Sequence, residues 1–170
     1  MRMGIIALCV VGAFSVASAQ PAYRDPPRAW TTGFGQGVSE AIIRNNQGAS
    51  FNVSCASGSG FAGQGATFFF TIELPRRQPR PAAQNLDAII EIDGTPYNFF
   101  FNRDRTVGRE VNYVSRAYNF RVTAQFEEVV RALRRGRSFT VYVVPDRVMQ
   151  RFSLSGARAA LDGFESLEGC

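Results

Sequence analysis

The chain has 170 residues and a net charge of +5, and it contains no histidine and no lysine, so all 19 basic residues are arginines. These absences exclude Ser-His-Asp and Cys-His catalysis and a lysine Schiff base, and a zinc site would depend on carboxylates and isolated cysteines. We therefore expect a single domain that is not an enzyme and needs no metal or cofactor.

Residues 1–19 have the form of a cleaved export signal. Met1–Met3 is a short charged start, Gly4–Val16 is mostly apolar, and Ala17–Ala19 is a small-residue cleavage site before Gln20. The apolar run is shorter than the ~20 residues that a helix needs to cross a bilayer. We therefore predict a periplasmic or secreted protein with no stable membrane insertion after signal cleavage.

The mature chain is expected to begin with a flexible leader, residues 20–29, followed by one domain, residues 30–170. Cys55 and Cys170 are the only cysteines left after the signal is removed. Because exported thiols are normally paired, we predict a disulfide between them. It would close a loop of 114 residues, and a loop-entropy model gives it about 4 to 5 kcal/mol of stability. A reactive free thiol is the alternative, but no histidine is present to activate it.

The first part of the domain carries the signals of short strands. Alternating or continuous apolar residues predict strands at Glu40–Arg44, Ser50–Ala56, Ala66–Leu74, Leu86–Ile92, Thr95–Asn102 and Arg109–Val114, with Tyr118–Val122 extending the sheet. Asp93-Gly94 is a strong hairpin signal. Three connections are predicted as loops: Gly58–Gly65, Pro75–Asn85 and the polar turn Asn102–Gly108.

Helix signals appear only in the C-terminal half. Thr123 is predicted to cap a helix that ends at Gly136. Its buried stripe consists of Phe126, Val129, Val130 and Leu133. Strands follow at Ser138–Val144 and Arg147–Leu154, and Ser155 is predicted to cap a short last helix that leads to Cys170. The fold class is therefore α+β, a mostly antiparallel β-sandwich or partly closed barrel with two short helices.

Two groups of charged residues are candidates for a site. Glu91 and Asp93 stand two apart, as paired catalytic carboxylates can, but a turn position and a solvent-facing strand position explain them more simply. An arginine patch at the end of the first helix is the other candidate: Arg131, Arg134, Arg135 and Arg137. It would suit an anionic partner, although dipole matching explains it equally well. Base-stacking aromatics are not interleaved with these arginines, so we expect no nucleic-acid binding.

Several short motifs of the chain together resemble a known family. They are Ser54-Cys55, the helix end at Gly136 that leads into Phe139–Val143, the Phe152–Gly156 segment followed by Ala160-Leu161, and the closing Cys170. This combination resembles the small exported VasI-type proteins that are associated with type VI secretion clusters of proteobacteria. The resemblance implies a periplasmic accessory domain with a Cys55–Cys170 bridge and no catalytic residues.

Two functional hypotheses follow from these observations. The first is a non-catalytic exported module that binds a protein or an anionic envelope component, linked to a secretion system or to the cell envelope. The alternative is a small exported enzyme inhibitor that presents a loop, Gly58–Gly65 or Pro75–Asn85, to an enzyme's cleft. The sequence indicates neither the partner nor the oligomeric state.

Overall fold

The computed structural model of the chain describes residues 29–35, 37–56, 67–75, 84–107, 110–116, 120–144, 148–162 and 164. Residues 1–28, which contain the predicted export signal and most of the predicted leader, and Cys170 lie outside these ranges. The described part forms nine strands and two helices: β1 (Thr31–Gly35), β2 (Val38–Arg44), β3 (Ser50–Ala56), β4 (Thr67–Pro75), β5 (Asn85–Ile92), β6 (Thr95–Val107), β7 (Glu110–Arg116), α1 (Phe120–Arg135), β8 (Phe139–Val143), β9 (Val148–Phe152) and α2 (Ala157–Ala160).

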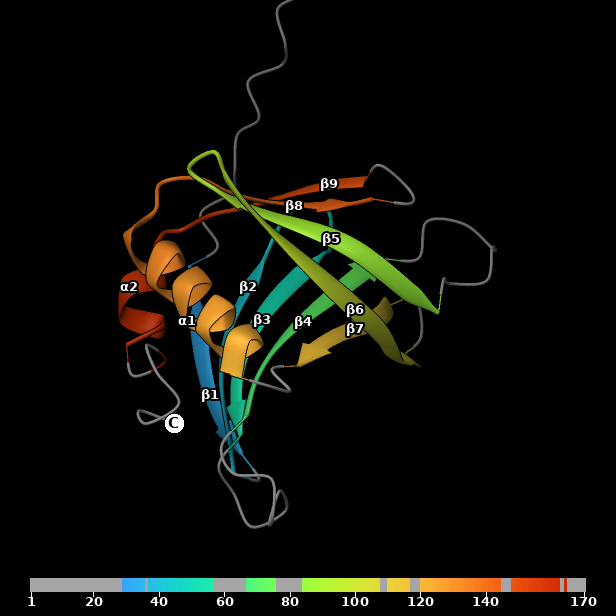
Figure 1. Cartoon of the computed structure of the whole chain (residues 1–170), viewed down its shortest axis with the longest axis horizontal. Helices are drawn as coiled ribbons and strands as arrows, with labels where there is room; N and C mark the ends of the chain where they lie inside the picture. Colours follow the sequence, from blue (N-terminus) through green and yellow to red (C-terminus); the bar gives the residue numbers. More distant parts are fainter. Residues whose placement is uncertain are drawn as a thin grey trace, which may run out of the picture.

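All nine strands belong to one sheet, in the order β1-β2-β3-β4-β7-β6-β5-β8-β9. Every neighbouring pair is antiparallel. The predicted α+β class is confirmed, since the chain is a mostly antiparallel sheet with two short helices in its C-terminal half (Figure 1). The sheet is not closed into a barrel, because β1 and β9 remain separate edges.

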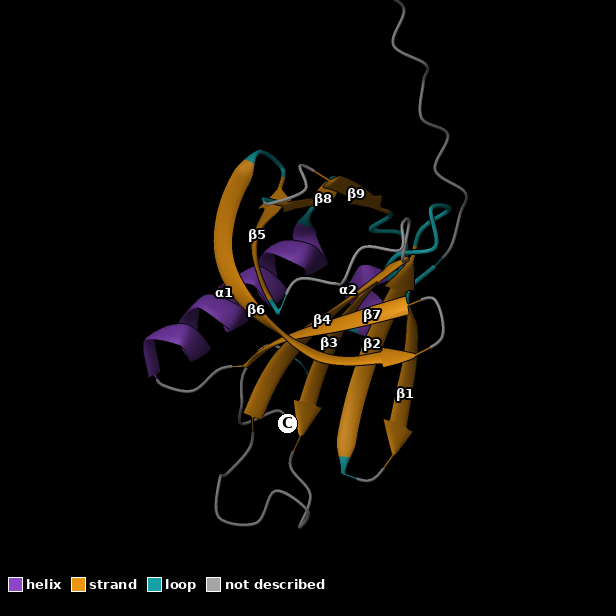
Figure 2. Cartoon of the chain, turned by 90° about the vertical axis from the view of Figure 1, so that its right-hand side faces the viewer, coloured by secondary structure: helices purple, strands orange, loops and turns teal. Residues whose placement is uncertain are grey.

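The long strand β6 divides the sheet into two parts. Its first half pairs with β5 and its second half pairs with β7, and the register shifts between Arg103 and Arg105. A bulge of this kind bends a strand and increases its twist. Figure 2 shows β6 curving from the part that contains β5, β8 and β9 toward the part that contains β1 to β4 and β7. The curved sheet therefore has a concave inner side and a convex outer side.

Helix α1 packs against the concave side and completes the core. Phe126 of α1 stacks on Phe70 of β4 with ring centroids 4.1 Å apart, and it meets Phe99 of β6 edge-on at 5.1 Å. The predicted stripe Phe126, Val129, Val130 and Leu133 is fully buried. Because these residues recur every three or four positions, one face of the helix fills the space between the two parts of the sheet.

Side chains connect the two ends of the sheet across the core. Phe51 of β3 meets Phe139 of β8 at 4.9 Å between ring centroids. The buried Asn45 after β2 donates from Nδ2 to Oε1 of the buried Gln150 in β9, at 2.9 Å. Trp30 donates from its indole nitrogen to the carbonyl oxygen of Ser153, at 3.0 Å. These contacts hold the curvature of the sheet, although no backbone ladder joins its ends.

The sequence predicted some boundaries wrongly. Tyr118–Val122 was expected to extend the sheet, but α1 already begins at Phe120, so Thr123 lies within the helix and does not cap it. A helix with a buried stripe gains an additional turn at little cost, because nucleation has already been overcome. Its first turn consequently contains no acidic residue, whereas Arg134 and Arg135 do lie in its last turn as expected.

Three further expectations differ from the structure. The polar segment after Asn102 continues as strand β6 to Val107, because β7 supplies hydrogen-bond partners for its backbone. The glycine-rich strand β1 was not predicted at all. The residue that caps α2 is Gly156, with φ of 79°, in place of Ser155. The left-handed conformation at that position suits glycine and little else.

Candidate functional site

Asp93 is a structural residue at the tip of the β5–β6 hairpin. It has φ of 49° and precedes Gly94 with φ of 82°, as a type I′ turn requires. Its carboxylate accepts hydrogen bonds from the backbone N–H groups of Arg137, at 3.0 Å, and Ser138, at 2.8 Å, and from the Ser138 hydroxyl at 3.1 Å. The carboxylate thus ties the hairpin to the connection between α1 and β8. Glu91 lies on β5 opposite Thr140 of β8.

These hydrogen bonds set the acidity of Asp93. The backbone N–H groups of Arg137 and Ser138 lower its pKa below the ordinary value of 3.8, and the positive charge of Arg137 adds to the effect. Tyr97 is shifted the other way, because burial and the nearby Glu128 raise its pKa above 10.0. Neither group therefore exchanges a proton near neutral pH, as a general acid or base would need to do.

The lowered pKa of Asp93 predicts a loss of stability in acid. A carboxyl group with a lower pKa in the folded state stabilises the fold above its unfolded pKa and loses this contribution as the pH falls through the folded value. We expect Asp93→Asn to lower the melting temperature at about pH 6 and to have progressively less effect below about pH 4. Thermal unfolding followed by circular dichroism from pH 2.5 to 7 measures this convergence.

Asp87→Asn is the matched control for that experiment. Asp87 is an exposed carboxylate on the same strand, and its side chain makes no hydrogen bond or ion pair to the described residues. We expect this variant to follow the wild type closely across the whole pH range. A constant difference between Asp93→Asn and the wild type down to pH 2.5 would contradict the role given to the Asp93 carboxylate.

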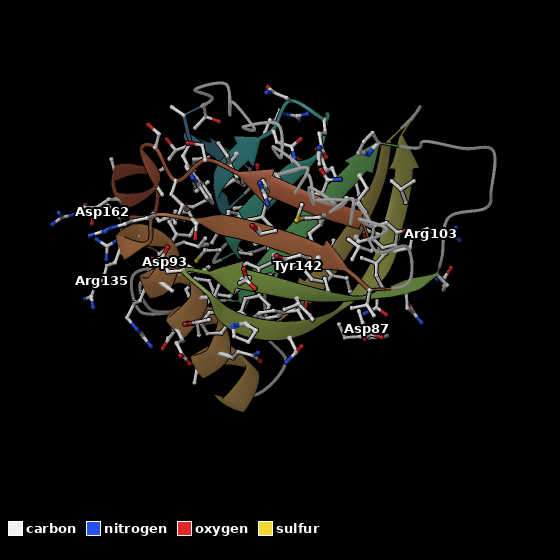
Figure 3. The ribbon with its side chains drawn as sticks, turned by 90° about the horizontal axis from the view of Figure 1, so that it is seen from above. Asp87, Asp93, Arg103, Arg135, Tyr142 and Asp162 are labelled. Carbon is white, nitrogen blue, oxygen red and sulfur yellow. The ribbon has the colours of Figure 1, made fainter. Side chains whose placement is uncertain are left out.

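The predicted arginine patch lies at the C-terminal end of α1, together with acidic residues. Arg134 donates to Asp162 at 2.9 Å, and Arg131 lies 3.8 Å from Glu127. Figure 3 shows Arg135, Asp162 and Asp93 at the same end of the molecule. Each acidic group offsets part of the positive field.

The two remaining members of the patch differ in their surroundings. Arg137 is exposed but close enough to Asp93 to lower the pKa of that carboxyl. Arg135 is exposed and has no ion pair with a described residue. Of the four arginines in the predicted patch, three therefore lie close to an acidic side chain, and fewer guanidinium groups are available to an anionic ligand than the sequence suggested.

Cys55 lies on the inner face of β3 and is 2 % exposed. It takes part in a disulfide bond. The predicted partner, Cys170, lies outside the described residues, so the Cys55–Cys170 pairing stays a prediction. The free-thiol alternative loses its support, since a bonded sulfur is not a nucleophile.

The described residues lack both a metal-binding cluster and a membrane-spanning helix. They contain no group of three or more cysteine, aspartate or glutamate side chains placed to hold a metal ion. Within the same residues, no helix has both the length and the apolar character that a membrane crossing demands.

The most distinctive surface is the outer side of β6-β5-β8-β9, which we call the upper face. In the described part of the chain four large apolar side chains are strongly exposed, and three of them lie here: Phe100 at 52 %, Val144 at 48 % and Met149 at 40 %. The half-buried Ile89 and Tyr142 lie between them. We call these five residues the apolar strip.

The strand register brings the apolar strip together. Ile89 of β5 pairs with Tyr142 of β8, and Tyr142 pairs with Met149 of β9. Phe100 of β6 stands opposite Asp87 of β5 at one end. Figure 3 looks onto this face, with Tyr142 near its middle and Asp87 and Asp93 toward opposite ends. Directly paired residues on one face lie about 5 Å apart, so Ile89, Tyr142 and Met149 form a continuous row. Val144 follows Tyr142 by two positions on the same side of the chain, and the exposed Asp87 separates Val144 from Phe100.

A shallow polar groove of about 540 Å³ continues the strip toward the end of α1. Its lining includes Glu91, Arg137, Thr140, Tyr142 and Arg151. Glu91, Thr140 and Arg151 stand side by side across three strands. The upper face therefore has an apolar centre, with Asp87 at one end and charged side chains of both signs at the other, which is the usual composition of a protein-binding surface.

Sequence reasoning missed the apolar strip, although one signal for it was present. Three phenylalanines in succession, Phe99 to Phe101, cannot all face the core of an alternating strand. The middle one, Phe100, must point to the opposite face, and the structure places it there. The other members come from separate strands, so only the pairing order brings them together.

No curated protein matches the chain, and no solved structure matches it. A family model named YfjT matches residues 28–161, a segment that runs from just before β1 to just after α2. The chain therefore belongs to the YfjT family.

Proposed function

We propose that this protein is a non-catalytic binding module that is exported to the periplasm or secreted, and that its upper face binds a partner protein. Export rests on the signal-like residues 1–19 and on the cysteine usage of the chain. A role beside a secretion system or in the cell envelope belongs to the same proposal, and the resemblance to VasI-type proteins supports it.

The observation that carries the proposal is the apolar strip. Val144 and Met149 expose their side chains beside the half-buried Tyr142 and Ile89, and the exposed Phe100 lies on the same face across β5. An exposed apolar patch of this kind on a soluble protein commonly marks an interaction site. Side chains held by four paired strands also lose little conformational entropy on binding, which leaves more of the contact energy for affinity.

An apolar protein partner is favoured over an anionic polymer. At the end of α1, Arg131 already forms an ion pair with Glu127, and Arg134 forms one with Asp162. The upper face carries Asp87 and Glu91 together with Arg151 and Arg137, and these opposite charges leave no net positive field to attract an anionic polymer. The non-catalytic part of the proposal rests on Asp93, whose carboxylate is committed to the backbone of Arg137 and Ser138.

Met149→Arg tests the proposal with little risk to the fold. Met149 is exposed on the edge strand β9, so the substitution should change the stability by no more than about 0.5 kcal/mol. A guanidinium placed within the strip must be desolvated by an apolar partner, so we expect affinity for that partner to fall at least tenfold. Affinity purification from cross-linked cell envelopes, quantified by mass spectrometry, measures the recovery of each protein.

Ala124→Arg provides the matched control, because it adds the same charge at an exposed position of α1. We expect this variant to recover the same proteins as the wild type. The informative quantity is the set of proteins lost only with Met149→Arg. If both variants and the wild type recover the same set in equal amounts, the upper face is not the binding surface.

A further inference from the structure

A crevice opens where strands β6 and β7 separate. The two strands pair from Val107 and Glu110 as far as Asn102 and Val114. Beyond that point β6 pairs only with β5, and β7 pairs only with β4, among the described residues. The resulting space of about 380 Å³ is within the usual size range of ligand sites.

The crevice exposes a stretch of strand backbone on the β6 side. The carbonyl oxygen of Asn98 accepts a hydrogen bond from Nε2 of Gln125 in α1, at 3.0 Å, so the backbone at Asn98 faces away from β5. Backbone direction alternates along a strand, and Phe100 therefore presents its N–H and carbonyl groups on the same side. Within the described residues the register pairs Phe100 with Asp87 alone.

The backbone directions along β5 agree with this alternation. The carbonyl oxygen of Asp87 accepts from the backbone N–H of Val144, at 2.9 Å, so the backbone at Asp87 faces β8. Its neighbour Ala88 then faces β6, where it pairs with Phe99. Phe99 thus directs its backbone toward β5, and Phe100 directs its own into the crevice.

The crevice has in its lining an arginine that lies over an aromatic ring. Arg116 of β7 lines it, and the guanidinium carbon lies 5.1 Å from the centre of the Phe69 ring. Arg116 is exposed and makes no ion pair with a described residue. Stacking on an aromatic ring holds a guanidinium in place and leaves its N–H groups available for a carboxylate.

The other charged groups of the crevice leave a positive balance. Arg103 also lines it and donates to Oε1 of Gln84 at 2.9 Å. Asp104 is the one acidic residue of the lining, and it has an interaction partner of its own. Asn98, Asn102, Ser115 and Gln125 are the uncharged polar residues of the lining.

We propose that this crevice binds the C-terminal end of an extended peptide. The peptide backbone would add to β6 by hydrogen bonds with the N–H and carbonyl groups of Phe100, as in other cases of strand addition. The terminal carboxylate would accept hydrogen bonds from Arg116, and an apolar side chain would rest on the exposed ring of Phe100. The site adjoins the apolar strip through Phe100, but its argument does not depend on what the upper face binds.

The probe is a blocked tetrapeptide, acetyl-Ala-Leu-Ala-Leu, with a free terminal carboxylate. Titration into the ¹⁵N-labelled mature protein should shift the backbone amide signal of Phe100 in a saturable manner. We expect the same peptide with a terminal amide to bind at least tenfold more weakly. A third peptide, the amide with an internal glutamate, separates a side-chain carboxylate from a terminal one, and acetate alone tests the anion without a backbone.

Arg116→Gln should weaken binding of the free-acid peptide at least tenfold, with an unchanged melting temperature. Arg158→Gln is the matched control, because Arg158 is exposed on α2 and loses the same charge. Equal binding of the acid and the amide would overturn carboxylate recognition. Saturation by acetate or by the glutamate peptide at the same concentration as the free acid would overturn recognition of a chain terminus. Shifts confined to β8 and β9, or none at all, would overturn the site itself.

Discussion

Val130→Asp is expected to lower the free energy of unfolding by about 4 kcal/mol or more, because the new carboxylate would be buried without a partner. Val130 is completely buried on the stripe of α1 that packs against the concave side of the sheet. A loss of this size approaches the entire stability of many domains of this length. Urea denaturation followed by tryptophan fluorescence measures it, since Trp30 is buried in the same core.

Two further variants keep this prediction testable if Val130→Asp fails to fold. Val130→Ala leaves a cavity and should cost about 2 kcal/mol, a value that an otherwise intact domain tolerates. Ala124→Asp introduces the same charge at an exposed position of the same helix, and it should change the stability by about 0.5 kcal/mol at most. Equal stability of all three variants would mean that α1 does not pack on the sheet.

Removal of the disulfide is the second change with a large expected effect. Cys55 is buried and bonded, and the predicted partner is Cys170. A crosslink between these residues would close a loop of 114 residues and so lower the entropy of the unfolded chain. Because Cys55→Ala removes this constraint, we expect it to lower the free energy of unfolding by about 4 kcal/mol. Cys170→Ala should lose a similar amount, and the double variant should lose little more than either one.

That comparison identifies the pair, because two residues that act through one bond are not additive. Reduction of the wild type with dithiothreitol should lower the stability by a similar amount without changing any side-chain volume. Mass spectrometry of a non-reduced digest should show the two cysteines in one linked peptide. Additive losses in the double variant, or full stability after reduction, would contradict the pairing.

Local patterns were sufficient to predict most of the elements of the fold. Asp93-Gly94 forms the predicted turn, and Phe126 to Leu133 form the predicted buried stripe, because turn chemistry and helical periodicity act over a few residues. The misplaced boundaries have an equally local cause. Thr123 is a good capping residue in isolation, but the chain continues the helix by one turn on its N-terminal side.

The pairing order of the strands could not be predicted in the same way. β4 pairs with β7, and β5 pairs with β8, across intervening segments that contain other strands or a helix. Strand β1 was missed because its residues are all exposed, so it shows no apolar alternation to detect. Its ladder to β2 holds it in place.

Both candidate binding features depend on this long-range pairing. The apolar strip exists because Ile89, Tyr142 and Met149 stand side by side on three strands. The crevice exists because β6 changes partner at Asn102. The arginine patch is different, because its members lie close together in the sequence and could be predicted from it. The ion pair of Arg134 with Asp162 could not, because it depends on the contact between α1 and the end of α2.

In-cell photo-crosslinking from position 142 tests most directly whether the apolar strip contacts a partner protein. Tyr142 is near the middle of the upper face, and benzoylphenylalanine in its place keeps an aromatic ring on strand β8. The same amino acid at position 158, on the exposed surface of α2, is the control. We predict one discrete protein adduct from position 142 that is absent from position 158 and is lost in the presence of Met149→Arg. No adduct from position 142, or the same adducts from both positions, would contradict a binding role for the upper face.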